Sequence, residues 1–261
     1  MSKSLLLLLM TMKATFALNF SVSTQNLWHY TTNYDERLDS LSKNIDFEKA
    51  DIMSFQEAWT SFSGKSLYSE YVSDPSLSIN FLKTNNTIVI KEGLSIASKF
   101  EHVGERFAFK LPHSKRFFGK RMMQVSTLKI PQGPEVYIIN VHFSPFGDKK
   151  NERIDQLNFV IDKIQNTFND RPVIITGDFN QDEDQDFFSP LKAIGFRSSA
   201  TKAEVGCTFC ETNIYTDEPF NSKLDYIFYQ SDIFKVESVR KIFVENPISD
   251  HYGMRAELSL L

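Results

Sequence analysis

The chain has 261 residues, of which 41% are hydrophobic and 24% charged, so it has ordinary globular composition and enough length for a substantial core. A formal net charge of −4 excludes a global basic attraction to nucleic acid, although local basic loops and bound cations can offset a mildly acidic surface. The two cysteines are too few for a disulfide framework. No internal repeat or linker divides the sequence, which favours one large domain.

The N-terminus has the pattern of an export signal. Lys3 supplies a positive charge, Leu5–Met10 is a short apolar run, and Thr15–Ala17 approximates a small-x-small cleavage site. The run is too short to span a bilayer, and the alternative interpretation is an apolar first strand or helix. We therefore expect residues 1–17 to be a signal peptide, residues 18–261 to be the mature domain, and the protein to be secreted or periplasmic.

Hydrophobic periodicity predicts a mixture of strands and helices along the mature chain. Residues 61–86 are rich in Ser, Asn and Tyr, and we expect them to be irregular. Two amphipathic helices are predicted at Tyr34–Lys49 and Asn151–Phe168, with a shorter helix through Leu191 and Ile194. Strands are predicted at Phe20–Leu27, Asp51–Glu57, Thr87–Ile90, Leu94–Ser98, Met122–Ile130, Glu135–Val141, Val173–Ile175, Leu224–Tyr229, Phe234–Val244 and Met254–Leu260.

Polar residues suited to metal or phosphate chemistry follow many of the apolar runs. In Gly177-Asp178-Phe179-Asn180 a carboxylate and a carboxamide come directly after a β-branched strand, although these residue types also occur in ordinary turns. Oxygen-rich ligation of this kind suits Mg²⁺ or Mn²⁺ better than zinc. The polar strand ends are Asn26, Glu57, His142, Asp178, Asn180 and the pair Asp250-His251.

The two cysteines lie in Cys207-Thr208-Phe209-Cys210. A zinc site would need further ligands nearby, and none is evident from the sequence. In an oxidising compartment the pair could instead close a small local loop.

Six short segments stand in order along the mature chain: Gln25–Trp28, Ser54–Glu57, Asn140–His142, Gly177–Asn180, Leu224–Phe228 and Ser249–His251. They resemble the motif set of the endonuclease/exonuclease/phosphatase superfamily, and the resemblance covers nearly all of the mature chain. The resemblance implies an α+β fold of the deoxyribonuclease I type, a four-layer sandwich in which two stacked mixed β-sheets are flanked by helices. It also implies hydrolysis of phosphoric esters with a divalent cation.

The resemblance implies a metal site and a nucleophile site. Glu57 would be the main metal ligand, with Asn26 and Asp250 beside it, and the cation would be Mg²⁺, with Mn²⁺ as an alternative. Asp178 and Asn180 would position the attacking water, the phosphate or a second metal ion.

The resemblance also implies roles for two imidazoles. His251 would be the general base, with Asp225 holding its tautomer, although Asp225 could simply bond backbone in a turn. His142 would donate to the phosphate or leaving group, supported by Glu92, and Arg121 would contact the phosphate. Glu92 and Arg121 could equally be ordinary surface charges.

The substrate class rests on two further segments. One series of residues is more similar to the neutral sphingomyelinase branch than to abasic-site enzymes. It consists of Gly206–Phe209, Asn213, Tyr215 and Leu224–Phe228. The basic and aromatic segment Lys110–Arg121 could grip a nucleic-acid backbone or place Phe117 and Phe118 in a lipid interface. A hairpin with its rings in the core is the third possibility for this segment.

We therefore expect a secreted, Mg²⁺-dependent phosphodiesterase, with a sphingomyelin-type phospholipid slightly preferred over nucleic acid as substrate. A deoxyribonuclease I-like endonuclease is the alternative, and a catalytically silent binding module on the same fold is a third hypothesis. No stable protein partner is implied.

Overall fold

The computed structural model describes residues 18–28, 32–60, 66–84, 92–114 and 120–261. The expected signal peptide, the expected strand Thr87–Ile90 and the expected interfacial residues Phe117 and Phe118 lie outside this part of the chain. No helix among the described residues is both long and apolar enough to cross a bilayer.

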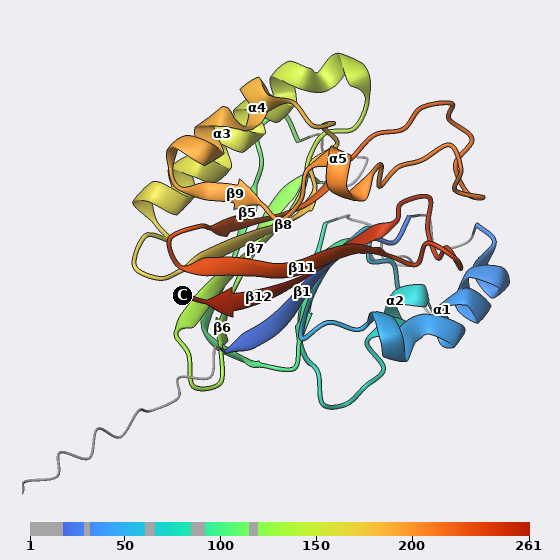
Figure 1. Cartoon of the computed structure of the whole chain (residues 1–261), viewed down its shortest axis with the longest axis horizontal. Coiled ribbons are helices and arrows are strands. Elements are labelled where there is room, and N and C mark those ends of the chain that lie inside the picture. The colour runs from blue at the N-terminus through green and yellow to red at the C-terminus, as the bar shows by residue number, and fades with distance from the viewer. Residues whose placement is uncertain (1–17, 29–31, 61–65, 85–91, 115–119) are drawn as a thin grey trace, which may run out of the picture.

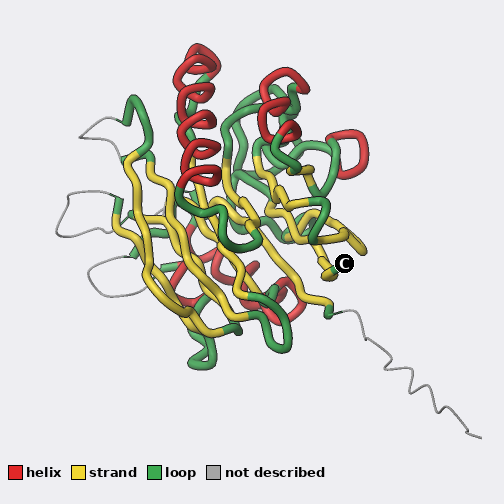
Figure 2. The backbone as a smooth tube through the Cα atoms, turned by 90° about the vertical axis from the view of Figure 1, so that its left-hand side faces the viewer, coloured by secondary structure: helices red, strands yellow, loops and turns green. Residues whose placement is uncertain are grey.

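Two six-stranded sheets lie face to face at the centre of the molecule (Figures 1 and 2). The first sheet has the strand order β11-β12-β1-β2-β4-β3, and only β1 and β2 run parallel within it. Its strands are β1 (Asn19–Asn26), β2 (Ile52–Gln56), β3 (Ser78–Lys83), β4 (Gly93–Ser98), β11 (Phe234–Ile242) and β12 (Gly253–Leu260).

The second sheet has the order β5-β6-β7-β8-β10-β9, and its single parallel pair is β7 and β8. Its strands are β5 (Glu101–Lys110), β6 (Met122–Lys129), β7 (Glu135–His142), β8 (Val173–Asp178), β9 (Phe196–Ser198) and β10 (Asp225–Gln230).

Helices cover the outer faces of both sheets. On the first sheet these are α1 (Tyr34–Glu48) and α2 (Leu67–Tyr71), and on the second α3 (Lys150–Asn166) and α4 (Gln185–Ala193). A single 3₁₀ turn, Gly147–Lys149, precedes α3, and the short helix α5 (Lys202–Val205) lies beyond β9.

Three apolar cores separate the four layers. The inner core joins side chains from both sheets, including Val22, Ile138 and Met254. A second core packs the second sheet against α3 and α4, and a third packs the first sheet against α1 and α2. Alternate residues of a strand face opposite sides, so the neighbours Ile52 and Met53 enter different cores. The predicted four-layer α+β sandwich is therefore confirmed.

The expectation that residues 61–86 are irregular is wrong for the described part. Ser66 caps α2 by accepting from the backbone N–H of Ser69, and β3 follows a few residues later. The edge strand β5 was also missed, because a bulge between Val103 and Phe107 interrupts its alternation at Gly104, whose φ of 66° favours glycine.

Strand register brings the polar strand ends to one edge of the sandwich. His142 pairs with Asp178 across β7 and β8, and Asp178 pairs with Asp225 across β8 and β10. In the facing sheet Asn26 pairs with Gln56, the residue before Glu57. These functional groups therefore stand in two facing rows, one from each sheet.

Buried polar side chains fix the two rows relative to each other. Gln56 Nε2 donates to Asn140 Oδ1 at 2.7 Å, and Thr176 Oγ1 donates to Ser54 Oγ at 2.7 Å. Because a buried polar group without a hydrogen-bond partner is costly, these contacts favour one offset of the two sheets relative to each other.

Candidate active site

A cavity of about 430 Å³ opens at this edge, and eight of the predicted site residues line it. They come from both sheets and from the loops that follow their strands. They are Asn26, Glu57, Arg121, His142, Asp178, Asn180, Asp250 and His251. Asp225 lies just behind this lining, in contact with His251.

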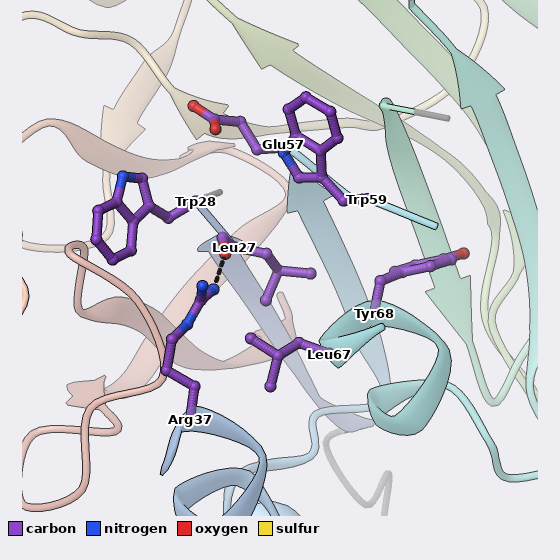
Figure 3. Close-up of a pocket in the computed structure, with 7 residues that line it drawn as sticks. All are labelled: Leu27, Trp28, Arg37, Glu57, Trp59, Leu67 and Tyr68. Carbon is purple, nitrogen blue, oxygen red and sulfur yellow. Dashed lines mark hydrogen bonds between the residues drawn. The ribbon is translucent and has the colours of Figure 1, made fainter. Parts of the chain in front are cut away.

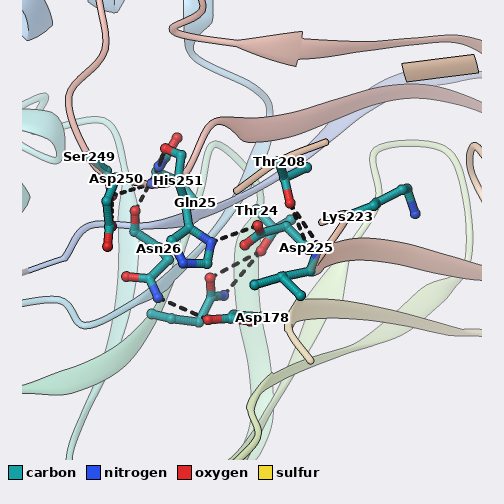
Figure 4. Close-up of polar contacts among 12 residues, drawn as sticks. Thr24, Gln25, Asn26, Asp178, Thr208, Lys223, Asp225, Ser249, Asp250 and His251 are labelled. Carbon is teal, nitrogen blue, oxygen red and sulfur yellow. Dashed lines mark hydrogen bonds and ion pairs between the residues drawn. The ribbon is translucent and has the colours of Figure 1, made fainter. Parts of the chain in front are cut away.

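His251 and Asp225 form a buried pair in which Nδ1 of the imidazole lies 2.9 Å from Asp225 Oδ2 (Figure 4). The carboxylate can only accept, so the proton of this bond belongs to Nδ1 and the lone pair of the neutral imidazole belongs to Nε2. Burial disfavours the imidazolium, but Asp225 and Asp178 outweigh burial and raise the pKa of His251 well above its ordinary value.

Asp178 is the most enclosed carboxyl of the cavity. Its Oδ2 accepts from Asn26 Nδ2 at 3.0 Å and from Asn180 Nδ2 at 3.2 Å, and its Oδ1 accepts from the Asn180 backbone at 2.8 Å. Burial raises the pKa of Asp178 to about 7, His251 opposes this increase, and Asp225 adds to it.

The turn that carries Asp178 and Asn180 explains two residue choices in the Gly-Asp-Phe-Asn motif. A Cβ at Gly177 would lie 2.1 Å from the Val141 carbonyl oxygen, so no side chain fits there. Asn180 has a φ of 50°, a left-handed conformation that asparagine tolerates better than most residues. The chain can therefore turn sharply and return the Asn180 carboxamide to Asp178.

His142 lies beside Arg121, whose Nη1 is 2.7 Å from both ring nitrogens. Burial, Arg121 and His251 hold the pKa of His142 well below its ordinary value, so the ring is neutral and the positive charge here is that of Arg121. His142 Nε2 also lies 3.5 Å from Asp178 Oδ2 and 4.0 Å from Glu57 Oε1.

Glu92 lies near this group but outside the residues that line the cavity. Within the described part of the chain, no hydrogen bond or ion pair joins Glu92 to His142, and Arg121 is the group that contacts the imidazole. Burial raises the pKa of Glu92 to about 7, with Glu57 contributing and Arg121 opposing.

The donor set around Glu57 fits a hard divalent cation. Glu57 and Asp250 supply carboxylates and Asn26 supplies a carboxamide, which are the oxygen ligands that Mg²⁺ prefers. Burial raises the pKa of Asp250 to about 6. The positive charge of His251 opposes this increase, and the negative charge of Glu57 adds to it. A cation would relieve this crowding of negative charge.

A second group of side chains could also hold a metal ion, because their ligand atoms lie within 4.8 Å of one another. It consists of Asp178, Asp225 and His251. The Nδ1 of His251 is already bonded to Asp225, and Asp178 already accepts from Asn26 and Asn180. We therefore interpret this group as a hydrogen-bonded network, and Glu57, Asp250 and Asn26 as the residues that could hold a cation.

The sequence interpretation missed Arg37 on α1, which is fully buried beneath the site. It donates to the carbonyl oxygen of Leu27 (Figure 3) and to those of Thr32 (2.9 Å) and Ile248 (2.7 Å). Arg37 therefore connects the segments that carry Asn26 and Asp250. Burial lowers the pKa of Arg37 to about 10. An arginine on the apolar face of a predicted helix, close to Leu38 and Leu41, was the available signal.

Sequence reasoning also left open the state of the two cysteines, and the structure joins Cys207 to Cys210 in a disulfide. The loop that they close lies against the His251 and Asp225 pair, since Phe209 forms backbone bridges with Ser222 and with His251.

The family model described as "Endonuclease/Exonuclease/phosphatase family" matches residues 23–251. Comparison with curated proteins by sequence gives no match.

Solved structures of low sequence identity share the fold. The human Nocturnin catalytic domain with bound sulfate anion has a TM-score of 0.72 and 17% identity, over 94% of this chain and 96% of that chain. A D. rerio TDP2 structure complexed with a single-strand DNA product has a TM-score of 0.70 and 18% identity, over 92% and 98%. An endonuclease/exonuclease/phosphatase from Bacteroides vulgatus has a TM-score of 0.72 and 20% identity, over 93% and 99%. The chain therefore belongs to the endonuclease/exonuclease/phosphatase family, whose members are generally hydrolases of phosphoric esters and typically depend on divalent metals.

Proposed function

We propose that this protein is an exported, Mg²⁺-dependent phosphodiesterase. The observation that carries the proposal is one cavity in which a polarised imidazole, His251 with Asp225, shares the lining with the oxygen-bearing side chains of Glu57, Asn26 and Asp250. Export is supported by the apolar run near the N-terminus and by the disulfide, which is typical of oxidising compartments.

In this proposal His251 is the general base. Its Nε2 takes a proton from the attacking water, while Asp225 keeps the other proton on Nδ1 and stabilises the imidazolium that forms. Asn180 and Asp178 orient the water and the phosphate. The attacking oxygen bonds to phosphorus as the bond to the leaving oxygen breaks in line.

Negative charge that develops on the phosphate needs fixed positive partners. Arg121 supplies a guanidinium charge, and the neutral His142 beside it has one N–H that can donate to a phosphate oxygen. A cation held by Glu57, Asn26 and Asp250 would supply further positive charge to the phosphate and would offset the carboxylates that raise the pKa of His251.

The rim of the cavity favours a phospholipid of the sphingomyelin type as the substrate. Phe146 is 75% exposed and Phe220 is 47% exposed, and both line the opening with Phe209. Among the described residues, Arg121 is the only lysine or arginine that lines the cavity. Polynucleotide binding relies on several such cations, whereas exposed rings suit an apolar substrate or its membrane surface.

A nuclease activity is the second candidate, because exposed rings also stack on bases and a TDP2 structure of the same fold holds a DNA product. Phosphocholine release from sphingomyelin vesicles should be compared with nicking of plasmid DNA, each with Mg²⁺ and with EDTA. We expect cation-dependent phosphocholine release. Plasmid nicking alone would reverse the substrate preference, and turnover of neither substrate would contradict both candidates.

A further inference from the structure

Thr208 is a fully buried residue that is bonded to Asp225 and to Tyr252, the residue that follows His251. Its hydroxyl oxygen accepts from the backbone N–H of Leu224 at 2.9 Å and from that of Asp225 at 3.2 Å (Figure 4). Its carbonyl oxygen accepts from the N–H of Tyr252 at 2.8 Å. Thr208 therefore binds the start of β10, where Asp225 lies, and it also binds Tyr252, the residue that follows His251.

The hydroxyl is used to its full acceptor capacity. A threonine oxygen has two lone pairs, and the two N–H groups that it receives belong to the consecutive residues Leu224 and Asp225 at the start of β10. The Thr208 N–H in turn donates to the Ser222 carbonyl at 2.9 Å, which fixes the loop from its other side. The Thr208 hydroxyl thus adds to the pairing of Asp225 with Asp178 in holding the start of β10.

The loop that carries Thr208 is closed on itself and anchored at its start. Cys207 and Cys210 are joined by a disulfide, and Lys241 Nζ donates to the Cys207 carbonyl at 3.1 Å. The ring of Phe209 stands edge-on to the His251 imidazole, with 5.0 Å between ring centroids. The Phe209 ring therefore limits rotation of the imidazole.

We propose that Thr208 is a positioning residue for the hydrolysis: its hydroxyl sets the position of Asp225 against His251, and the Cys207–Cys210 disulfide holds the loop that presents it. The inference rests on the proposed function for its consequence in catalysis. Its structural content, the dependence of the bond between His251 and Asp225 on the Thr208 hydroxyl, can be measured without substrate.

The Thr208→Val variant keeps the shape and volume of the side chain and leaves the N–H groups of Leu224 and Asp225 without an acceptor. Thr208→Ser restores the hydroxyl, and Thr127→Val, on β6, is a control for the same substitution at another buried threonine. With Mg²⁺ and a soluble phosphodiester, we expect Thr208→Val to lower kcat about tenfold, which corresponds to roughly 1.4 kcal/mol, with KM within about twofold. Thr208→Ser and Thr127→Val should stay within about threefold of the wild-type kcat.

A proton NMR measurement on the substrate-free protein at one fixed pH tests the same claim independently of activity. The Nδ1 proton of His251, bonded to a buried carboxylate, should give a downfield, slowly exchanging resonance that is assigned by its loss in His251→Gln. We expect Thr208→Val to broaden or abolish this resonance, and Thr208→Ser and Thr127→Val to retain it.

An unchanged resonance together with an unchanged kcat in folded Thr208→Val would overturn the inference. Should Thr208→Val fail to fold, the double variant Cys207→Ser, Cys210→Ser opens the loop but keeps the hydroxyl. We then expect a smaller loss of kcat and a broadened resonance, and wild-type behaviour in both measurements would overturn the inference. If the wild-type protein hydrolyses no phosphodiester, the proposed function fails, while the NMR comparison still decides the role of Thr208.

Discussion

At the scale of single residues, the pairing of His251 with Asp225 sets which imidazole nitrogen faces the cavity. Asp225 Oδ2 binds Nδ1, so the chemistry of the site depends on a carboxylate that does not itself line the cavity. Conversely, the neutral ring of His142 is set by burial and by the Arg121 charge. The pKa values of the two imidazoles are thus shifted in opposite directions: that of His251 is raised, which makes the neutral ring a stronger proton acceptor, and that of His142 is lowered, which keeps its ring neutral beside the phosphate.

The His251→Gln variant should lower kcat by about 10²–10⁴-fold, because general-base assistance is lost. Asp225→Asn should also lower kcat, since the amide can donate to Nδ1 and then stabilises the tautomer whose Nε2 cannot accept a proton. Initial rates on a soluble phosphodiester with Mg²⁺ measure both effects. His113→Gln is the matched control, because His113 is an exposed imidazole that pairs with Asp155. Wild-type rates in His251→Gln would contradict its assigned role.

At the scale of elements, α1 is attached to the site through one side chain. Arg37 binds carbonyl oxygens of the segment after β1 and of the loop before His251, as Figure 3 shows for Leu27. Because these carbonyls are buried, the helix supports the positions of Asn26 and Asp250 from below.

We expect Arg37→Met to lower the free energy of unfolding by about 3 kcal/mol, because several buried carbonyl oxygens lose a charged donor. Chemical denaturation followed by circular dichroism measures the change. Lys43→Met on the same helix is the control, since Lys43 is an exposed residue paired with Asp39, and it should change stability by less than about 0.5 kcal/mol. Equal free energies of unfolding for the two variants would show that the hydrogen bonds of Arg37 do not stabilise the protein.

The aromatic rim is a property of the loops rather than of the strands. The double variant Phe146→Ser, Phe220→Ser should reduce hydrolysis of sphingomyelin in vesicles by about tenfold, because two exposed rings no longer enter the lipid surface. Hydrolysis of a soluble phosphodiester should stay within about twofold of wild type. Ile154→Ser, on α3, is the control for loss of an exposed apolar side chain. Equal losses on both substrates would contradict an interfacial role.

Periodicity predicted the central strands and the long helices well, because their burial alternates without interruption. The strand β8 and the helix α3 were both found where the apolar spacing placed them. The strand β5 was missed since the Gly104 bulge shifts its faces, and α2 depends on a cap at Ser66 more than on an apolar stripe. Local pattern is a weak guide where a bulge or a cap decides the structure.

The site was predictable as a set of polar strand ends, but its connections were not. Register places His142, Asp178 and Asp225 side by side, and register is a long-range property that a single sequence does not reveal. Arg37 and Thr208 act through buried backbone groups of distant segments, so their importance becomes visible only in the folded chain.

At the scale of the whole molecule, the cavity concentrates carboxyls whose pKa values are raised by burial. These values are about 7 for Asp178 and Glu92 and about 6 for Asp250. Each carboxyl keeps its proton to a higher pH in the folded protein than in the unfolded chain. Between about pH 4 and these folded-state pKa values, the folded protein binds more protons at the three carboxyls than the unfolded chain does. The contribution of these carboxyls to the free energy of unfolding therefore falls as the pH rises. His142 acts in the opposite direction, because its pKa is lowered.

Divalent cations should therefore stabilise the protein more at pH 8 than at pH 5, since protons compete for the same carboxyls at the lower pH. Mg²⁺ is added at ten times its half-saturating concentration. We expect it to raise Tm by several degrees at pH 8, at roughly 2–4 °C per kcal/mol of stabilisation, and by much less at pH 5. Asp250→Asn should reduce the increase at pH 8, whereas Asp148→Asn, an exposed acid outside the cavity, should not. An equal increase at both pH values would contradict cation binding at this site.

The central claim, a cation-dependent phosphodiesterase site at the edge of two facing sheets, is tested most directly by restoring activity to metal-free protein. The measurement is hydrolysis of bis(p-nitrophenyl) phosphate by EDTA-treated protein as Mg²⁺ is added back, for the wild type and for Glu57→Gln. We predict no turnover without metal, saturable recovery with Mg²⁺ in the wild type, and a recovery in Glu57→Gln that is at least about 10²-fold weaker. Full activity in EDTA, or equal recovery of the two proteins, would contradict the account.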